Sequence, residues 1–202
     1  MSIHLLINII MRVIDTDKIE RIKKEAKILI VNKGYHGASI AEIAKKANVS
    51  DGYLYRHYKN KSELVKDILE KQLEQFHDHI FALLDEKQTL KSVLDGIISF
   101  LFNLSQEEPY AITFAHMLVY DHEFVYPQSR HDAINKLSKD LLNLGIKNGE
   151  ISQTTREIDI QLTILNIPVK FIEYNSKGYY ENYLTEKKEK ELLINLCMNA
   201  LK

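Results

Sequence analysis

The sequence contains few of the residues that break helices and almost none of the residue that forms disulfides. Its 202 residues include 7 glycines, 3 prolines and 1 cysteine. Because all-β proteins need many turns, the scarcity of glycine and proline favours a helical protein. The single cysteine, Cys197, excludes an intrachain disulfide and is compatible with a reducing cytoplasm. Apolar neighbours at helical spacing indicate that Cys197 is a small core residue.

Long apolar runs are also absent. Residues 1–11 carry no charged side chain, but a helix that crosses a bilayer needs roughly 20 apolar residues. A signal peptide would have basic residues before the apolar run and a small-residue cleavage site after it, and neither is found. We interpret residues 1–14 as an apolar N-terminal extension that is disordered or packs on a partner, with Met11 as an alternative start of translation. We expect a cytoplasmic protein that does not contact a membrane.

The chain lacks a net positive charge overall, but its positive charge is concentrated near the N-terminus. The whole chain has a formal net charge of -1, which by itself is not typical of a protein that binds nucleic acid. Residues 12–71 hold 14 Lys and Arg against 9 Asp and Glu, a net charge of +5, whereas the other residues hold 13 against 19, a net charge of -6. The basic part favours binding of a polyanion there. Chance fluctuation of solvated charges is the alternative that charge alone leaves open.

Apolar residues recur at helical spacing along nearly the whole chain. No segment of useful length alternates apolar and polar residues, so no sheet is predicted. Pro168 falls inside one predicted helix and should kink it, because proline lacks the backbone N–H. The predicted fold class is all-α, with about nine helices. They are expected near residues 17–33, 39–46, 50–57, 60–83, 88–104, 106–120, 128–148, 156–176 and 185–201.

Two short helices follow one another closely near the N-terminus. The stretch Ser39–Glu42 is typical of a capping box at a helix start, and Ser50 caps the next helix. Only the three residues 47–49 separate the two helices, and a longer supporting helix precedes them. This order is typical of a helix-turn-helix. We therefore predict a DNA-binding domain over residues 15–60 and a second helical domain over residues 61–202.

The second short helix carries polar and aromatic residues on the face that we expect to be exposed. Such groups can reach phosphates and base edges in the major groove. They are Gly52, Tyr53, Tyr55, Arg56 and His57. Lys61 begins the next helix, where its charge adds to the free N–H groups and the positive end of the helix dipole, and both favour a phosphate. A solvated helix face is the alternative for each of these residues.

The run from Ser39 to Lys61, SIAEIAKKANVSDGYLYRHYKNK, resembles the DNA-binding domain of the TetR family of bacterial repressors. The family pattern is a Thr or Ser cap, Ile-Ala, Ala-Gly-Val-Ser, Gly, an aliphatic-Tyr pair, His or Tyr, an aromatic residue and a Lys. Asn48 replaces the usual glycine, but asparagine tolerates the left-handed conformation. Tyr58 matches an aromatic residue that packs in the core. The resemblance implies that Gly52 and Tyr53 lie against base edges.

Other DNA contacts also follow from the resemblance. It implies that Ser39 and Lys61 contact phosphates, and that Tyr55 and His57 contact phosphates or sugars. Asp51 has no evident role, because phosphate repels an acid. The full set of DNA-binding candidates is Ser39, Ser50, Gly52, Tyr53, Tyr55, Arg56, His57 and Lys61.

The resemblance further implies a homodimer and a ligand site. The last two helices, 156–176 and 185–201, would form a four-helix bundle with a second copy. Candidates for this interface, which burial within the chain would explain equally, are Leu162, Leu165, Val169, Ile172, Leu192, Leu193 and Leu196. A ligand site would lie among the middle helices, where polar or aromatic side chains stand in apolar surroundings. The candidates are Phe102, Phe114, His116, Met117, Tyr120, Asn166 and Phe171.

The function implied is transcription regulation without a cofactor. The protein would be a repressor that an unknown small molecule releases from a near-palindromic double-stranded operator. One alternative is a structural DNA-binding protein that senses no ligand. A second is an enzyme with a metal held among His116, Asp121, His122 and His131. No glycine-rich phosphate loop, nucleophile elbow or zinc-binding helix motif is present, so we expect neither catalysis nor a metal site.

Overall fold

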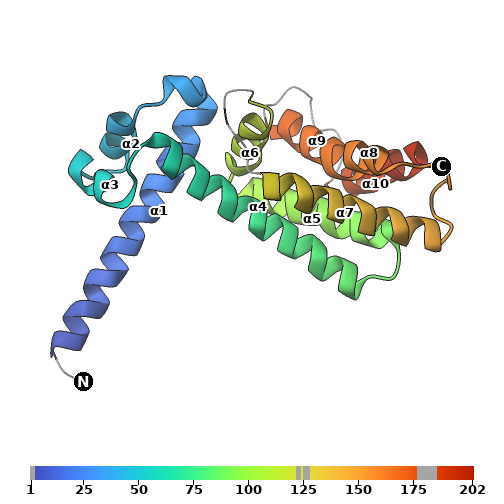
Figure 1. The fold of residues 1–202 in the computed structure, drawn as a ribbon, viewed down its shortest axis with the longest axis horizontal. Coiled ribbons are helices and arrows are strands. Elements are labelled where there is room, and N and C mark those ends of the chain that lie inside the picture. The colour runs from blue at the N-terminus through green and yellow to red at the C-terminus, as the bar shows by residue number, and fades with distance from the viewer. Residues whose placement is uncertain (1–2, 122–123, 125–127, 177–185) are drawn as a thin grey trace. The chain divides into compact units, whose positions relative to one another are not determined.

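The structure is a computed structural model that describes residues 3–121, 124, 128–176 and 186–202. These residues form helices and no strand, which confirms the predicted all-α class (Figure 1). When the continuous run from Glu157 to Ser176 is counted as one helix, the described part of the chain forms nine helices. None of the helices described is both long enough and apolar enough to span a membrane. The chain divides into two compact units, Met1–Gln72 and Leu73–Lys202.

The N-terminal unit contains α1 (Ile3–Gly37), α2 (Ile40–Lys46), α3 (Asp51–His57) and the first part of α4 (Lys61–Glu86). Helix α1 begins at Ile3, well before the predicted start at Asp17. The physical reason is that this stretch contains no glycine or proline to end a helix. Gly34, where the sequence predicts a helix end, has a positive φ of 75° and interrupts α1 with a kink, beyond which residues 35–37 form a short continuation.

The apolar faces of these helices meet in one core. Ile22, Ala26 and Ile30 of α1 are fully buried, as are Leu64 and Val65 of α4. The two short helices contribute the remaining side chains. These include Ile43, Ala44, Ala47 and Leu54. Because α2 and α3 are each only 7 residues long, neither would be stable alone, and packing on α1 and α4 is what keeps them helical.

In the C-terminal unit, α5 (Leu90–Glu107) is the central helix (Figure 1). Its neighbours are α6 (Ala111–Val119), α7 (Gln128–Lys147), α9 (Ile167–Ser176) and α10 (Glu186–Ala200). One face of α5 is buried from Leu90 to Phe102. It carries Leu90, Val93, Leu94, Ile97, Ile98, Leu101 and Phe102. Cys197 of α10 is fully buried, which confirms the predicted core position, and burial raises the pKa of its thiol to about 12.

The predicted helix 156–176 is divided by a change of hydrogen bonding. It consists of α8 (Glu157–Ile160), a π-helical segment η1 (Gln161–Asn166) and α9. The N–H of Ile167 bonds to the carbonyl of Leu162, five residues back. Pro168, which has no N–H of its own, follows directly. The irregularity predicted for Pro168 therefore lies in the turns before it, as a π segment in a continuous helix.

A carboxylate from another part of the chain stabilises the start of α5. Glu150 accepts hydrogen bonds from the N–H of Leu90 at 2.6 Å and from the N–H of Lys91 at 3.0 Å. These two donors have no partner within the helix, and the negative charge lies at the positive end of the helix dipole. Thr89 adds a third bond, from the N–H of Ser92 to its hydroxyl at 3.1 Å.

Glu150→Ala should lower the free energy of unfolding by about 1.5–3 kcal/mol, because it leaves two N–H groups without their charged acceptor. Denaturant unfolding followed by circular dichroism measures this. Glu150→Gln, which retains one acceptor oxygen, should give an intermediate value. The exposed Glu74 of α4 is the control, and Glu74→Ala should change the value by less than about 0.5 kcal/mol. Equal stability of wild type and Glu150→Ala would contradict the capping role.

Candidate functional site

The two helices of the predicted helix-turn-helix are both capped by serine. The hydroxyl of Ser39 accepts a hydrogen bond from the N–H of Glu42 at 3.2 Å, and Ser50 accepts one from the N–H of Tyr53 at 3.1 Å. The carboxylate of Glu42 binds Lys33 of α1 at 2.6 Å. Each predicted cap is therefore confirmed, but Glu42 links α2 to α1 where a capping box was expected.

The turn between the helices has the backbone conformation that the sequence suggested. Among the described residues, Asn48 is the one non-glycine residue with a positive φ, which is 55°. Ala44 and Ala47 are buried where α2 and α3 approach each other. The side chain of Arg21 in α1 donates to the carbonyl of Ala47 at 3.2 Å. Helix α1 thus holds the turn directly, and asparagine supplies the left-handed residue that is usually a glycine.

The exposed face of α3 carries four of the eight residues predicted to bind DNA. Tyr55 is 55% exposed, and Gly52, Arg56 and His57 are also exposed. Tyr53 differs from the prediction of an exposed side chain, because only 7% of it is accessible. Its hydroxyl donates to the carboxylate of Asp15 at 3.1 Å. The early part of α1 therefore covers a side chain that α3 alone would leave in solvent.

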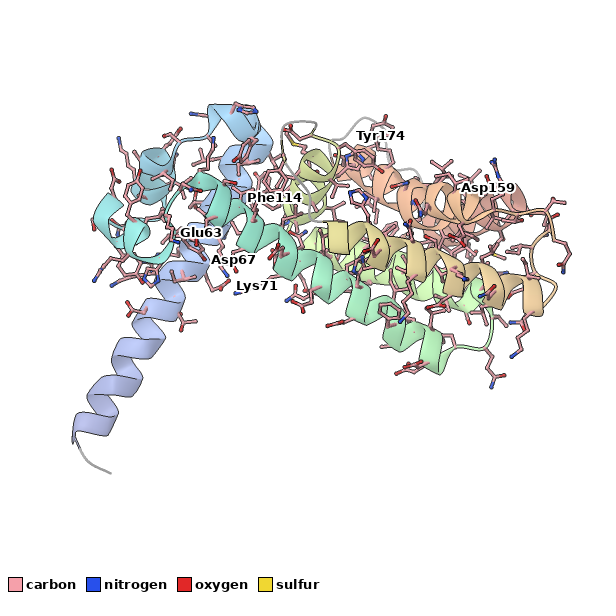
Figure 2. All side chains as sticks on the ribbon, viewed as in Figure 1. Glu63, Asp67, Lys71, Phe114, Asp159 and Tyr174 are labelled. Carbon is pink, nitrogen blue, oxygen red and sulfur yellow. The ribbon has the colours of Figure 1, made fainter. Side chains whose placement is uncertain are left out.

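Helix α3 ends in a network of charged and polar groups (Figure 2). The buried Tyr58 donates from its hydroxyl to Asp67 at 2.8 Å, and Lys23 of α1 lies 3.1 Å from the same carboxylate. Lys71, one turn further along α4, is 3.6 Å away. Burial opposes ionisation of Asp67, but the bonds from Tyr58 and Lys23 outweigh it, and its pKa is lowered. The predicted core position of Tyr58 is confirmed.

The side chain of Lys61 makes its contacts within the N-terminal unit. Its ammonium donates to the carbonyls of Tyr35 at 2.5 Å and Ala38 at 2.8 Å. It also lies 4.4 Å from the centre of the Tyr35 ring. Burial lowers its pKa. Lys61 thus joins the start of α4 to the last turn of α1 and to Ala38 after it, an attachment that the sequence did not reveal. Its contact with a phosphate stays a prediction.

Five of the seven residues predicted to bind a ligand contact one another in pairs within the C-terminal unit. The hydroxyl of Tyr120 donates to the side-chain oxygen of Asn166 in η1 at 2.8 Å. The rings of His116 and Tyr120 are 4.8 Å apart, and those of Phe102 and Phe171 are 6.3 Å apart. Phe114 and Phe102 are buried, whereas Tyr120 is 56% exposed. Met117 lies on α6, one residue after His116.

A buried carboxylate that sequence reasoning missed lies in the same cluster. Glu173 is 3% exposed, and its Oε2 lies 2.8 Å from the ammonium of Lys170 and 3.4 Å from Nδ1 of His116. The available signal was its spacing, because Glu173 follows Asn166 by seven residues, which puts both on one helix face. Because a buried charge is costly unless it is paired, an acid on this face predicts that cationic partners lie close to the ligand candidates.

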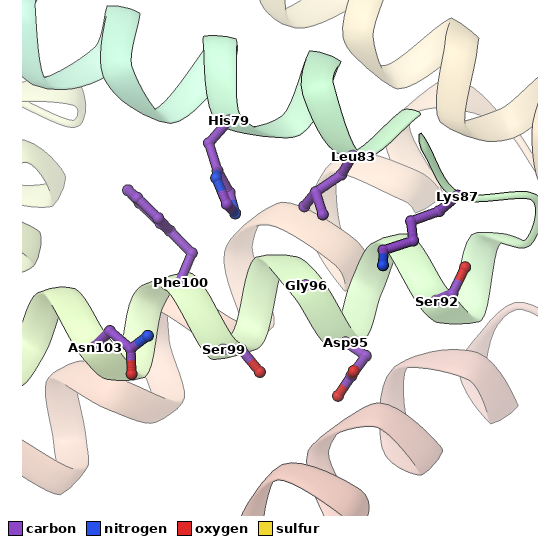
Figure 3. A pocket seen from close by; sticks show the side chains of 9 residues that line it. All are labelled: His79, Leu83, Lys87, Ser92, Asp95, Gly96, Ser99, Phe100 and Asn103. Atoms are coloured by element: carbon purple, nitrogen blue, oxygen red, sulfur yellow. The ribbon is translucent and has the colours of Figure 1, made fainter. Parts of the chain in front are cut away.

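A groove of about 360 Å³ lies elsewhere in this unit, between α4 and α5 (Figure 3). Its lining includes Lys87, Asp95 and Asn103 along with the stacked rings of His79 and Phe100. None of the predicted ligand residues lines it. Among the described residues no group of three His, Cys, Asp or Glu side chains could hold a metal ion. His122, one member of the alternative metal set, lies outside the described residues.

The predicted interface residues divide into two groups. Leu162, Leu192 and Leu196 are 52–58% exposed. Ile172 and Leu193 are buried in the core of the same chain, so for them burial within the chain accounts for the apolar pattern. Leu165 and Val169 are partly buried. Ile158 of α8, 46% exposed, was not predicted and adds to the exposed group.

Comparison with known proteins is consistent with this geometry. The sequence profile described as "Bacterial regulatory proteins, tetR family" matches residues 22–68, which include both short helices. Over 135 residues the chain is 30% identical to the fatty acid metabolism regulator protein of Bacillus subtilis, covering 62% of this chain and 66% of that protein. The chain belongs to the TetR family. It is a DNA-binding transcription regulator.

Solved structures agree with this family at the level of the fold. A TetR-family regulator from Marinobacter aquaeolei gives a TM-score of 0.75 at 18% identity, covering 94% of this chain and 98% of that one. The regulator FadR from Bacillus subtilis, in complex with stearoyl-CoA, gives a TM-score of 0.65 at 21% identity, covering 91% and 99%. The similarity in fold to these solved structures therefore covers both units of this TetR-family chain.

Lys61→Ala should lower the free energy of unfolding by about 1–3 kcal/mol, because two carbonyls lose a charged donor. If Lys61 also contacts a phosphate, binding should weaken by a similar factor on every duplex, since phosphate carries no base information. Denaturant unfolding and fluorescence anisotropy with several duplexes measure the two effects. Lys59→Ala is the matched control, because it removes a neighbouring exposed charge and should leave stability nearly unchanged. Loss of affinity for one duplex only would refute the phosphate contact.

Proposed function

We propose that this TetR-family regulator is a homodimeric repressor that a small molecule releases from a near-palindromic operator. The observation that carries the DNA-binding part is the exposed polar face of α3, which is capped by Ser50 and tied by hydrogen bonds to Asp15 of α1 and, through Tyr58, to Asp67 of α4. A helix with such a face can enter the major groove. A bacterial operator lies in the cytoplasm, so we also place the protein there. No catalytic step is part of the proposal.

The proposed DNA contacts are those predicted from the sequence, with one exception. Gly52, Tyr55, Arg56 and His57 are exposed on α3. The hydroxyls of Ser39 and Ser50 accept hydrogen bonds at helix starts, where the free N–H groups of a helix attract phosphate. Tyr53 is the exception, because its side chain is buried.

Dimer formation is supported by the distribution of exposed apolar side chains. Among the residues whose side-chain exposure the structure describes, which excludes 1–14, every exposed large aliphatic residue lies on α8, η1 or α10. They are Ile158, Leu162, Leu192 and Leu196. Burying each of these against a second copy would contribute roughly 1–2 kcal/mol, by the cost of exposing apolar surface. A twofold axis through these helices presents two copies of α3 to the duplex.

Selection from a random duplex library should recover a near-palindrome whose half-sites are separated by about 34 Å or a multiple of it. Leu196→Glu should convert the protein to a monomer, because it places a charge in the proposed interface, and binding to the palindrome should fall while the chain stays folded. Light scattering and anisotropy measure the two outcomes.

Ala82→Glu is the control for charge, since Ala82 is exposed on α4, and it should remain a dimer. A wild-type protein that is monomeric at micromolar concentration would rule out the dimer. Affinity of the wild type that does not change between low and physiological salt would rule out the proposed DNA contacts, because phosphate binding releases counterions.

We propose an acyl-CoA thioester as the ligand class. The support is the 30% identity to a fatty acid metabolism regulator and the similar fold of a regulator in complex with stearoyl-CoA. Within the chain, the cluster around Tyr120 and Asn166 combines aromatic rings with paired polar groups. It lies beside the π segment, and such segments are frequent at functional sites.

Helix α4 is the element that can relate this cluster to DNA binding. It runs without interruption from Lys61 to Glu86 and contributes residues to both units. A ligand changes DNA affinity only as far as it binds two states of the protein differently. We propose that the acyl-CoA favours a state of α4 that does not fit the operator.

Stearoyl-CoA should weaken operator binding by about 5–150-fold, the usual range of such coupling, and saturating operator should weaken stearoyl-CoA by the same factor. Calorimetry with and without operator measures this reciprocity. Tyr120→Phe, which removes the hydroxyl bonded to Asn166, should weaken stearoyl-CoA by about 3–10-fold. The matched control, Tyr110→Phe at the start of α6, should bind as the wild type does. Equal affinities with and without operator would refute the switch and leave DNA binding intact.

A further inference from the structure

The side chain of Tyr53 is enclosed by groups from α1 as well as from its own helix. Its hydroxyl lies 3.1 Å from the carboxylate of Asp15 and 3.4 Å from the carbonyl oxygen of the same residue. The Lys18 ammonium is 5.0 Å from the centre of the ring, and the Arg56 guanidinium carbon is 5.1 Å from it. The ring of His57 is 4.8 Å away. Burial, followed by the Asp15 bond, raises the pKa of Tyr53.

Two of these neighbours are cations on different helices. Both lie within the distance of about 6 Å at which a cation is attracted to an aromatic ring. Lys18 comes from α1 and Arg56 from α3, yet the same ring holds both beside the helix that is proposed to enter the major groove. Lys18 was not among the residues that the sequence suggested for DNA binding. Its ammonium lies 4.0 Å from the carboxylate of Asp15, and because 34% of the side chain is exposed, an anion can approach it beside that carboxylate.

We infer that Tyr53 positions the DNA-binding surface from inside the domain and contacts no base. In this role its ring holds Lys18 and Arg56 ready to pair with phosphates on the DNA backbone, and Asp15 holds the ring by its hydroxyl. Lys18 then becomes a phosphate contact contributed by α1. The inference rests on the proposed DNA contacts of α3 and replaces the base contact that was expected for Tyr53.

Geometry argues against a base contact. A base contact requires that the tyrosine hydroxyl or ring edge reach a groove, but the hydroxyl is bonded to Asp15 and only 7% of the side chain is accessible. Exposing the ring would break that bond and separate the ring from both cations. Because phosphate carries no base information, a ring that positions two phosphate contacts should affect affinity without affecting base preference.

The experiment measures DNA affinity at several salt concentrations, on one duplex selected by the wild type and on a panel of single-base variants of it. Lys18→Ala and Arg56→Ala should each reduce the slope of log affinity against log salt by about 1, as expected for a lost phosphate contact. Lys24→Ala removes an exposed lysine elsewhere on α1 and should leave the slope unchanged. Tyr53→Leu should weaken binding by about 2–5-fold per cation released, equally on every duplex.

Tyr53→Phe keeps the ring and loses only the hydroxyl, so its affinity should lie between those of wild type and Tyr53→Leu. Lys18→Ala should cost less affinity in the Tyr53→Leu background than in wild type, which a general loss of stability would not produce. Thermal unfolding of each variant shows that it is folded.

Altered preference at one base pair in Tyr53→Leu would show that Tyr53 reads a base and would overturn the inference. Wild-type slope in Lys18→Ala and wild-type affinity in Tyr53→Leu would overturn it as well. If the wild type itself shows no salt-dependent DNA binding, it is the proposed function that fails.

Discussion

The carboxylate of Asp67 lies where three helices of the N-terminal unit meet. It accepts the hydroxyl proton of Tyr58 at the end of α3, pairs with Lys23 of α1 and belongs to α4 itself. Removing this carboxylate would be costly, because the buried hydroxyl of Tyr58 and the ammonium of Lys23 would both lose their acceptor. The direction of α3, and with it every proposed DNA contact on that helix, depends on this junction and on the small residues packed beneath the turn.

The helix-turn-helix could be predicted from local signals because its elements are fixed by local chemistry. Ser39 and Ser50 cap their helices by bonds to residues three positions later, and Asn48 takes the left-handed conformation within one turn. Tyr53 could not be placed in this way. Its burial depends on Asp15, which is 38 residues earlier in the chain, and on a helix start that the sequence did not indicate. Likewise the carbonyl partners of Lys61 belong to a segment more than 20 residues away.

In the C-terminal unit, periodicity identified the helices but not which apolar residues face outward. Leu192 and Leu193 are adjacent and similar, yet one is 58% exposed and the other 2%. A repeat of about 3.6 residues shows that a helix has an apolar stripe. A wide stripe contains both buried core residues and residues that are exposed on the surface of the chain. The burial of Glu173 could not be predicted from the sequence, because its pairing with Lys170 and His116 exists only in the folded chain.

The π segment sets the rotation of α9 relative to α8 within one continuous helix. Successive residues of an α-helix are rotated by about 100° around its axis. A stretch bonded five residues apart holds an additional residue relative to a regular helix. Removing one residue from Gln161–Asn166 would therefore turn everything after it by about 100° relative to α8. Ile158 and Leu162 would still point outward, but Asn166 and Glu173 would leave the aromatic cluster. The segment acts as an angular offset between the exposed apolar residues of α8 and the residues that pair with Tyr120 and His116.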